Sequence, residues 1–114
     1  MIHGDGGQIR DFIHVNDVCR AILQSIHVPK LESSIFNVGT GNGISVADLA
    51  KMISVTVESM GGPVSDIYFT EEREGDVRIS ISDISGSMPI LDPAKMISLE
   101  QGIRDLIGRT IDEP

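Results

Sequence analysis

The spacing of apolar residues along the chain predicts three main helices. In residues 15–27, 45–60 and 98–108 apolar side chains recur every three or four positions, which places them in one stripe along a helix. Pro29 ends the first helix and Gly61 the second, because proline cannot continue a helix and glycine is favoured just beyond one. In chain order, the stripe residues are Val15, Val18, Cys19, Ile22 and Ile26; Val46, Leu49, Ile53, Val57 and Met60; and Leu99, Ile103, Leu106 and Ile107.

Serine residues mark where the second and third helices begin. Ser45 has Asp48 three residues later, and Ser98 has Gln101, so both pairs resemble a capping box in which the serine accepts a backbone N–H of the first turn. The third helix is expected to end near Gly108.

Short extended runs between these helices predict a small sheet. Residues 10–14 form one such run, residues 35–38 form a short apolar one, and residues 67–69 and 77–81 alternate between apolar and polar side chains. Alternating strands and helices predict an α/β fold, a small sheet of short strands with about three main helices. The chain has no internal repeat or linker, so we expect a single domain over residues 1–114.

Composition and charge restrict the possible partners. The net charge of −8, with nine lysines and arginines scattered along the chain, argues against nucleic acid, whose phosphates require clustered basic residues. No apolar run approaches the ~20 residues that span a bilayer, and the first residues lack the pattern of a signal peptide. We therefore expect a cytoplasmic protein with no membrane partner.

The cysteine and histidines do not predict a metal or redox site. Cys19 is the only cysteine and lies in the apolar stripe of the first helix, so we expect a buried small hydrophobic side chain. His3, His14 and His27 show no paired ligand spacing, and we expect no metal.

Two charged segments predict a site for a nucleotide sugar. Arg10 follows the glycine-rich residues 4–7, and Arg73 opens the sequence Arg-Glu-Gly-Asp that ends at Asp76. A guanidinium offers a planar fork to phosphate oxygens, and a carboxylate accepts hydrogen bonds from a ribose diol. Arg10, Arg73 and Asp76 are therefore the predicted substrate-binding residues.

Each arginine also has a purely structural interpretation. Arg10 can form a surface ion pair with Asp5 or Asp11. Arg73 can be a solvated residue of a loop that also contains Glu71, Glu72 and Glu74.

The order of the motifs resembles a known family. Residues 4–18, 36–46, 73–85 and 98–103 resemble successive motifs in the C-terminal third of the extended short-chain dehydrogenases, the NAD-dependent nucleotide-sugar epimerases and dehydratases such as UDP-glucose 4-epimerase. The resemblance implies the substrate-binding portion of that fold without its Rossmann cofactor domain. One departure is local: Gly86 and Pro89 fall where the family has a helix, so we expect a short or irregular helix there.

The resemblance implies a diphosphate held by Arg10 and Arg73 and a nucleotide ribose held by Asp76. It also implies NAD chemistry that depends on a Tyr-x-x-x-Lys pair. Tyr68 is the only tyrosine, and no lysine stands four residues later. The glycines of 39–43 read G-x-G-x-G, not the dinucleotide fingerprint G-x-G-x-x-G, and a structural role is preferred. We thus expect no catalytic residue, and no cofactor for this chain alone.

Three functions stay open. The chain is a substrate-binding fragment of an epimerase or dehydratase, a non-catalytic nucleotide-sugar-binding module, or a structural and oligomerising remnant without ligand. Without a cofactor domain, the helix 15–27 and the strand 35–38 would lose their usual cover. We therefore expect a homodimer, with Phe36 in the interface, or association with a separate cofactor domain.

Overall fold

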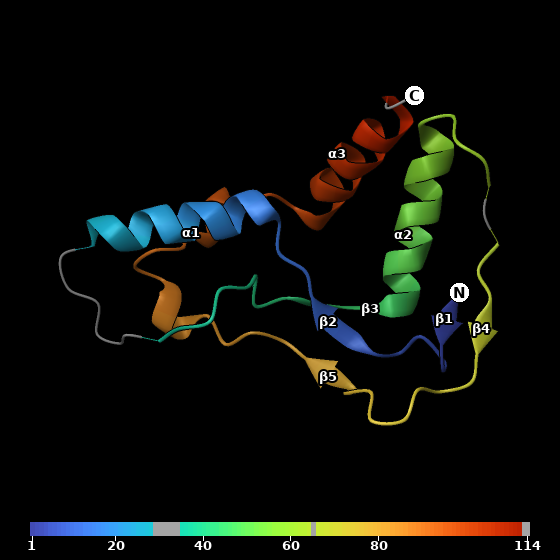
Figure 1. The fold of residues 1–114 in the computed structure, drawn as a ribbon, viewed down its shortest axis with the longest axis horizontal. Coiled ribbons are helices and arrows are strands. Elements are labelled where there is room, and N and C mark those ends of the chain that lie inside the picture. Colours follow the sequence, from blue (N-terminus) through green and yellow to red (C-terminus); the bar gives the residue numbers. More distant parts are fainter. Residues whose placement is uncertain (29–34, 65, 113–114) are drawn as a thin grey trace.

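Three helices form most of the regular structure in the computed structural model, which describes residues 1–28, 35–64 and 66–112. They are α1 (Val15–His27), α2 (Val46–Ser59) and α3 (Leu99–Asp112), and α2 and α3 lie side by side (Figure 1). The three predicted helices are confirmed. The α3 helix runs past Gly108, where we predicted its end, because one glycine costs a helix only about 1 kcal/mol.

The ends of the helices follow the predicted signals in most places. The Ser45 hydroxyl accepts from the Asp48 backbone N–H at 3.0 Å and donates to its carboxylate at 2.5 Å. At the other end of α2, Gly61 has φ +81° and the Gly62 N–H donates to the Val57 carbonyl at 2.9 Å. A left-handed residue followed by this bond is the Schellman motif, which favours glycine.

The third helix has only half of its capping box. Ser98 Oγ accepts from the Gln101 N–H at 3.2 Å, but the Gln101 side chain donates to Asp105 at 2.7 Å and does not reach back to Ser98. The α1 helix has a cap that we did not predict, since His14 Nδ1 accepts from the Asn16 N–H at 3.1 Å.

Within the described residues, five short strands form two small sheets. Strands β1 (Ile2–His3) and β4 (Phe69–Thr70) pair in parallel, and β2 (Ile9–Asp11) lies between β3 (Gly43–Ser45) and β5 (Ile79–Ser80). The β2–β3 pair is antiparallel and the β2–β5 pair is parallel. This arrangement confirms an α/β fold with short strands, and it places Arg10 in the central strand of the larger sheet.

One strand prediction is wrong and two strands were missed. Residues 35–38 are described but form no strand, because β2 pairs with β3 and β5 instead. The Phe36 and Val38 side chains pack against the core. The missed strands are β1 and β3, and β3 begins at the last glycine of the loop 39–43.

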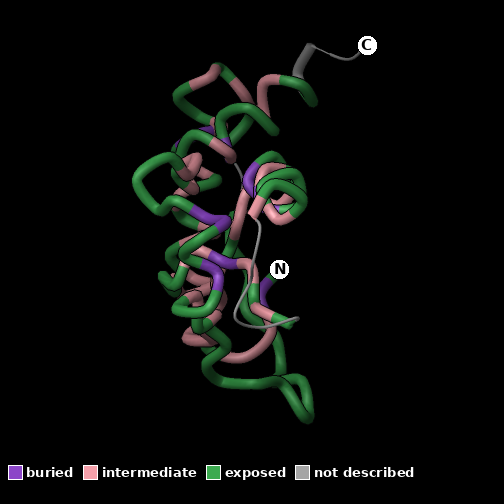
Figure 2. The backbone as a smooth tube through the Cα atoms, turned by 90° about the vertical axis from the view of Figure 1, so that its left-hand side faces the viewer, coloured by how far each residue is buried: buried purple, intermediate pink, exposed green. Residues whose placement is uncertain are grey.

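The core lies beneath α1. Ala21 packs with the buried Ile90 and Leu91 of the segment that follows β5. As predicted, that segment is irregular and contains only two short 3₁₀ helices, η1 (Ser85–Ser87) and η2 (Pro93–Lys95). Figure 2 shows that buried residues are few and spread over several segments.

The buried face of α1 is not its apolar stripe. Asp17 and Ala21 are buried, whereas Cys19 is exposed, so the predicted burial of Cys19 is wrong. Most of the stripe is exposed, because α1 packs on Ile90 and Leu91 through Ala21. Among the described helices, none is long and apolar enough to cross a lipid bilayer.

Candidate functional site

Two of the three predicted site residues meet in the structure. Strand β2 carries Arg10, and the loop between β4 and β5 carries Asp76, 66 positions later in the chain. Arg10 Nη2 lies 2.5 Å from Asp76 Oδ1, and Nη1 donates to the Ile9 carbonyl at 2.8 Å. Both side chains are partly exposed, at 28% and 29%, so a ligand in solution can reach this pair.

Gln8 completes this cluster, and sequence reasoning missed it. Gln8 Nε2 donates to Asp76 Oδ2 at 3.0 Å and to the His3 carbonyl at 2.7 Å. Both neighbours are acceptors, which fixes the orientation of the amide and leaves the buried Oε1 without a hydrogen-bond partner. The available signal was the spacing, because residues two apart in extended backbone face the same side. Gln8, Arg10 and Asp76 thus form one polar cluster.

Arg73 lies in the same loop as Asp76 but outside the cluster. The Asp76 N–H donates to the Arg73 carbonyl at 3.2 Å, and Gly75 between them has φ +79°, as a type II turn requires. The Arg73 side chain is exposed, and no hydrogen bond or ion pair joins it to any residue that the structure describes. Its position therefore agrees with the solvated alternative and leaves its guanidinium available.

Arg10 forms an ion pair with Asp76, and not with Asp5 or Asp11 as its structural interpretation expected. Asp5 forms a two-pronged ion pair with Arg78, with N–O distances of 2.8 and 3.0 Å. The hydrogen bond from Arg78, together with one from the Gly7 N–H, lowers the pKa of Asp5 to about 2. The same pair raises the pKa of Arg78.

Asp11 ties the sheet to the glycine-rich loop. Its carboxylate accepts from the Thr40 hydroxyl at 2.5 Å, from the Thr40 and Gly41 N–H groups at 3.0 Å, and from the Ser82 N–H at 3.3 Å. Burial raises the pKa of Asp11, but these hydrogen bonds to the charged form outweigh it, so the pKa lies below its ordinary value. Asp11 is therefore a structural anchor beside the candidate site.

The glycine-rich loop does not fit a dinucleotide. A Cβ on Gly39 would lie 2.3 Å from Ser82 Oγ and 2.7 Å from Asp11 Oδ2, so this glycine allows close packing within the chain. The N–H groups of Thr40 and Gly41, which would face a pyrophosphate in a dinucleotide loop, donate to Asp11 instead. The loop 39–43 therefore lacks the free N–H donors of a dinucleotide-binding loop.

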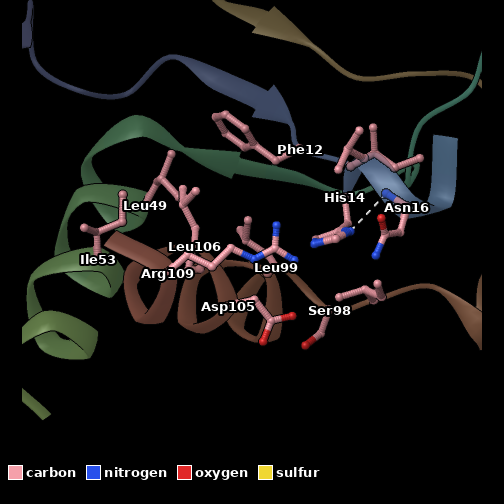
Figure 3. Close-up of a pocket in the computed structure, with 15 residues that line it drawn as sticks. Phe12, His14, Asn16, Leu49, Ile53, Ser98, Leu99, Asp105, Leu106 and Arg109 are labelled. Carbon is pink, nitrogen blue, oxygen red and sulfur yellow. Dashed lines mark hydrogen bonds between the residues drawn. The ribbon is translucent and has the colours of Figure 1, made fainter. Parts of the chain in front are cut away.

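A separate cavity of about 380 Å³ lies between the start of α1 and the helices α2 and α3 (Figure 3). Apolar side chains such as Leu49, Ile53 and Leu106 line it, with His14 and Arg109 among its polar groups. None of the three predicted substrate-binding residues contributes to it, so this cavity is not the candidate site. In the described part of the chain, no three His, Cys, Asp or Glu side chains are grouped to hold a metal.

Comparisons with known proteins agree with the resemblance. A sequence profile for the NAD dependent epimerase/dehydratase family matches residues 1–39. The dTDP-L-rhamnose 4-epimerase of Burkholderia thailandensis is 31% identical over 105 residues, which are 92% of this chain and 28% of the relative.

Solved structures match nearly the whole chain. The UDP-N-acetylglucosamine 4-epimerase from Methanobrevibacter ruminantium M1, in complex with UDP-N-acetylmuramic acid, gives a TM-score of 0.81 at 29% identity over 99% of this chain and 34% of that one. The UDP-glucuronic acid 4-epimerase from Bacillus cereus, in complex with UDP-glucuronic acid and NAD, gives a TM-score of 0.73 at 26% identity. The match covers 96% of this chain and 35% of that one.

In each of these comparisons, this chain spans about a third of the length of the protein that it resembles. Family profile, relatives and solved structures agree, and the chain therefore belongs to the NAD-dependent nucleotide-sugar epimerases and dehydratases, as a counterpart of their C-terminal part.

Proposed function

We propose that this chain is the nucleotide-sugar-binding portion of an NAD-dependent epimerase or dehydratase and has no catalytic activity alone. The observation that carries the proposal is the cluster of Gln8, Arg10 and Asp76, which joins two charged segments that are distant in the sequence. Arg73, with an exposed guanidinium, stands in the loop that supplies Asp76.

The cluster offers two kinds of polar group to a nucleotide. Arg10 has five N–H donors and gives one each to Asp76 and to the Ile9 carbonyl, so it keeps donors for phosphate oxygens. Asp76 accepts from a ribose diol while Gln8 holds its second oxygen. Each charge-assisted bond to the ligand contributes about 1.5–3 kcal/mol.

Features of the chain support the proposed lack of catalytic activity alone. Tyr68 is exposed, its hydroxyl donates to Asp66 at 3.1 Å, and no lysine stands four residues later. Hydride chemistry would need NAD, and the loop that resembles a dinucleotide site uses its N–H donors on Asp11. A cofactor-binding part, on the same or another chain, would have to supply that chemistry.

Calorimetric titration of the chain with UDP- and dTDP-sugars tests the proposal. We expect at least one of them to bind, and Arg73→Ala to weaken its binding about tenfold, which corresponds to ~1.4 kcal/mol. Arg73→Lys should recover little of this loss, because an ammonium group cannot form the planar fork. Arg104→Ala is the matched control, since it removes the same charge from the exposed face of α3 and should bind as the parent does.

Two results would count against this function. If no nucleotide sugar binds or stabilises the chain, the structural and oligomerising alternative is favoured. If a sugar binds equally well to the Arg73 variants and to the control, the pocket lies elsewhere on the molecule.

A further inference from the structure

Gln8 lies at the junction between the two small sheets. It directly precedes β2, and its side-chain Nε2 donates to the carbonyl of His3 in β1 at 2.7 Å. Its backbone is held as well, because the Gln8 carbonyl accepts from the N–H of Val46, at the start of α2, at 2.9 Å. The Gln8 side chain therefore extends from a fixed position beside the candidate site.

The loop that carries Asp76 joins the same two sheets. It leaves β4, the partner of β1, and enters β5, the partner of β2 (Figure 1). Residues 71–78 of this loop are all exposed, and exposed loops are more mobile than the strands that they connect. A carboxylate on such a loop needs further links to keep one orientation.

Both oxygens of the Asp76 carboxylate have such a link. Oδ1 lies 2.5 Å from Arg10 Nη2, and Oδ2 accepts from Gln8 Nε2 at 3.0 Å. A carboxylate held at one oxygen still turns about its last bond, whereas one held at both oxygens keeps its plane. An ionised carboxylate has about four acceptor positions, so each oxygen keeps about one for a ligand.

Gln8 itself has no polar group left for a ligand. Its amide nitrogen carries two hydrogens, which the Asp76 carboxylate and the His3 carbonyl accept. Its Oε1 is buried. Any effect of Gln8 on a bound nucleotide therefore passes through the Asp76 carboxylate.

We propose that Gln8 is a positioning residue that makes this site selective for ribonucleotides over 2′-deoxyribonucleotides. The inference rests on the proposed function, in which Asp76 receives the ribose of a nucleotide sugar. Two fixed oxygens with about one free acceptor position each match the two hydroxyls of a ribose, and a 2′-deoxyribose leaves one position unused. UDP-sugars are then preferred to dTDP-sugars.

Calorimetric titration with UDP and with 2′-deoxy-UDP tests this selectivity. The two probes share their base and diphosphate, so the ratio of their dissociation constants reports the 2′-hydroxyl alone. We expect the parent chain to bind UDP about tenfold more tightly, which corresponds to ~1.4 kcal/mol.

Two substitutions of Gln8 should reduce this ratio to below about three. Gln8→Met removes the amide donors and keeps the length of the side chain. Gln8→Glu replaces the donors with a carboxylate that repels Asp76. Circular dichroism checks that each variant keeps its helices.

Gln101→Glu is the matched control. Gln101 Nε2 donates to Asp105 Oδ1 at 2.7 Å on α3, so this substitution makes the same change beside an aspartate outside the cluster. It should leave the ratio of the two dissociation constants as it is in the parent chain.

Asp76→Asn separates positioning from direct contact. It should reduce the ratio by itself, and Gln8→Met added to it should change the ratio no further. A further fall in the double variant would show that Gln8 contacts the ribose directly, which overturns the positioning role.

Two other results overturn the proposal. One is a parent chain that does not bind UDP, or that binds both probes equally. The other is a pair of Gln8 variants that keep the ratio of the parent, including variants that weaken both probes by the same factor, as a purely structural residue would. The proposed function survives these results if a nucleotide sugar still binds and Arg73→Ala weakens it, and it fails as well if no nucleotide sugar binds.

Discussion

Replacing Asp11 with asparagine tests whether one carboxylate holds the sheet and the glycine-rich loop together. Four donors converge on this side chain: the hydroxyl and N–H of Thr40 and the N–H groups of Gly41 and Ser82. They come from segments 29 and 71 positions away. Asparagine keeps the size of the side chain but has one acceptor oxygen in place of two, and its amide nitrogen faces donors.

The expected loss of stability follows from this count of acceptors. One amide oxygen serves two of the four donors, so two lose their acceptor, at about 1–2 kcal/mol each where a polar group is partly buried. Water can reach part of this site, because Asp11 is only partly buried, and the bonds are not additive. We therefore expect Asp11→Asn to lower the free energy of unfolding by about 2–4 kcal/mol.

Urea denaturation at neutral pH measures this change. Asp5→Asn is the matched control, since it makes the same substitution in an exposed ion pair and should have a much smaller effect. A loss below about 1 kcal/mol for Asp11→Asn, or one equal to that of the control, would refute the role of Asp11 as an anchor.

Three further predictions concern packing, pH and the cofactor. Gly43→Ala should lower the free energy of unfolding by about 1–3 kcal/mol, because the new Cβ would lie 2.4 Å from Ile9 Cγ2 and 2.7 Å from Ile81 Cδ1. An unchanged midpoint of urea denaturation would contradict this packing. The pKa of Asp5 is about 2 in the folded chain against an ordinary 3.8, so the unfolded chain takes up this proton first on acidification. The stability that the pair with Arg78 provides is therefore complete above pH 3.8 and is lost as the pH falls from 3.8 to 2. Urea denaturation at a series of pH values should show this loss for the parent chain, and Asp5→Asn should abolish it. NAD should not bind the chain alone, and a calorimetric dissociation constant below ~100 μM would be the contrary result.

The helices could be predicted from sequence because each carries its own signals. The stripe of α2, the serine at its start and the glycines at its end act over a few residues, and the structure follows them. The strands have two or three residues each, so their pairing depends on distant partners. This is why the apolar run 35–38 was mistaken for a strand and why β1, which pairs with Phe69 and Thr70, was missed.

The faces of the elements were harder to predict than the elements themselves. Periodicity identified the apolar stripe of α1 but could not show that the helix packs through Ala21 and leaves Cys19 exposed. Likewise, Arg10 and Asp76 were identified as separate ligand groups, whereas their ion pair needs the parallel pairing of β2 and β5. Side-chain chemistry was readable from the sequence, and the contacts between distant segments were not.

The way α1 is attached has a consequence for the cooperativity of unfolding. Its core with Ile90 and Leu91 is separate from the α2–α3 pair, and few polar links join it to the chain before α3. The fully buried Asp17 accepts from the Ile97 N–H at 2.9 Å, and Arg20 donates to the Lys95 carbonyl at 2.9 Å. A segment held this way opens as its own subglobal unit, so amide hydrogens of α1 in the single chain exchange before those of α2. One melting temperature would then average two transitions.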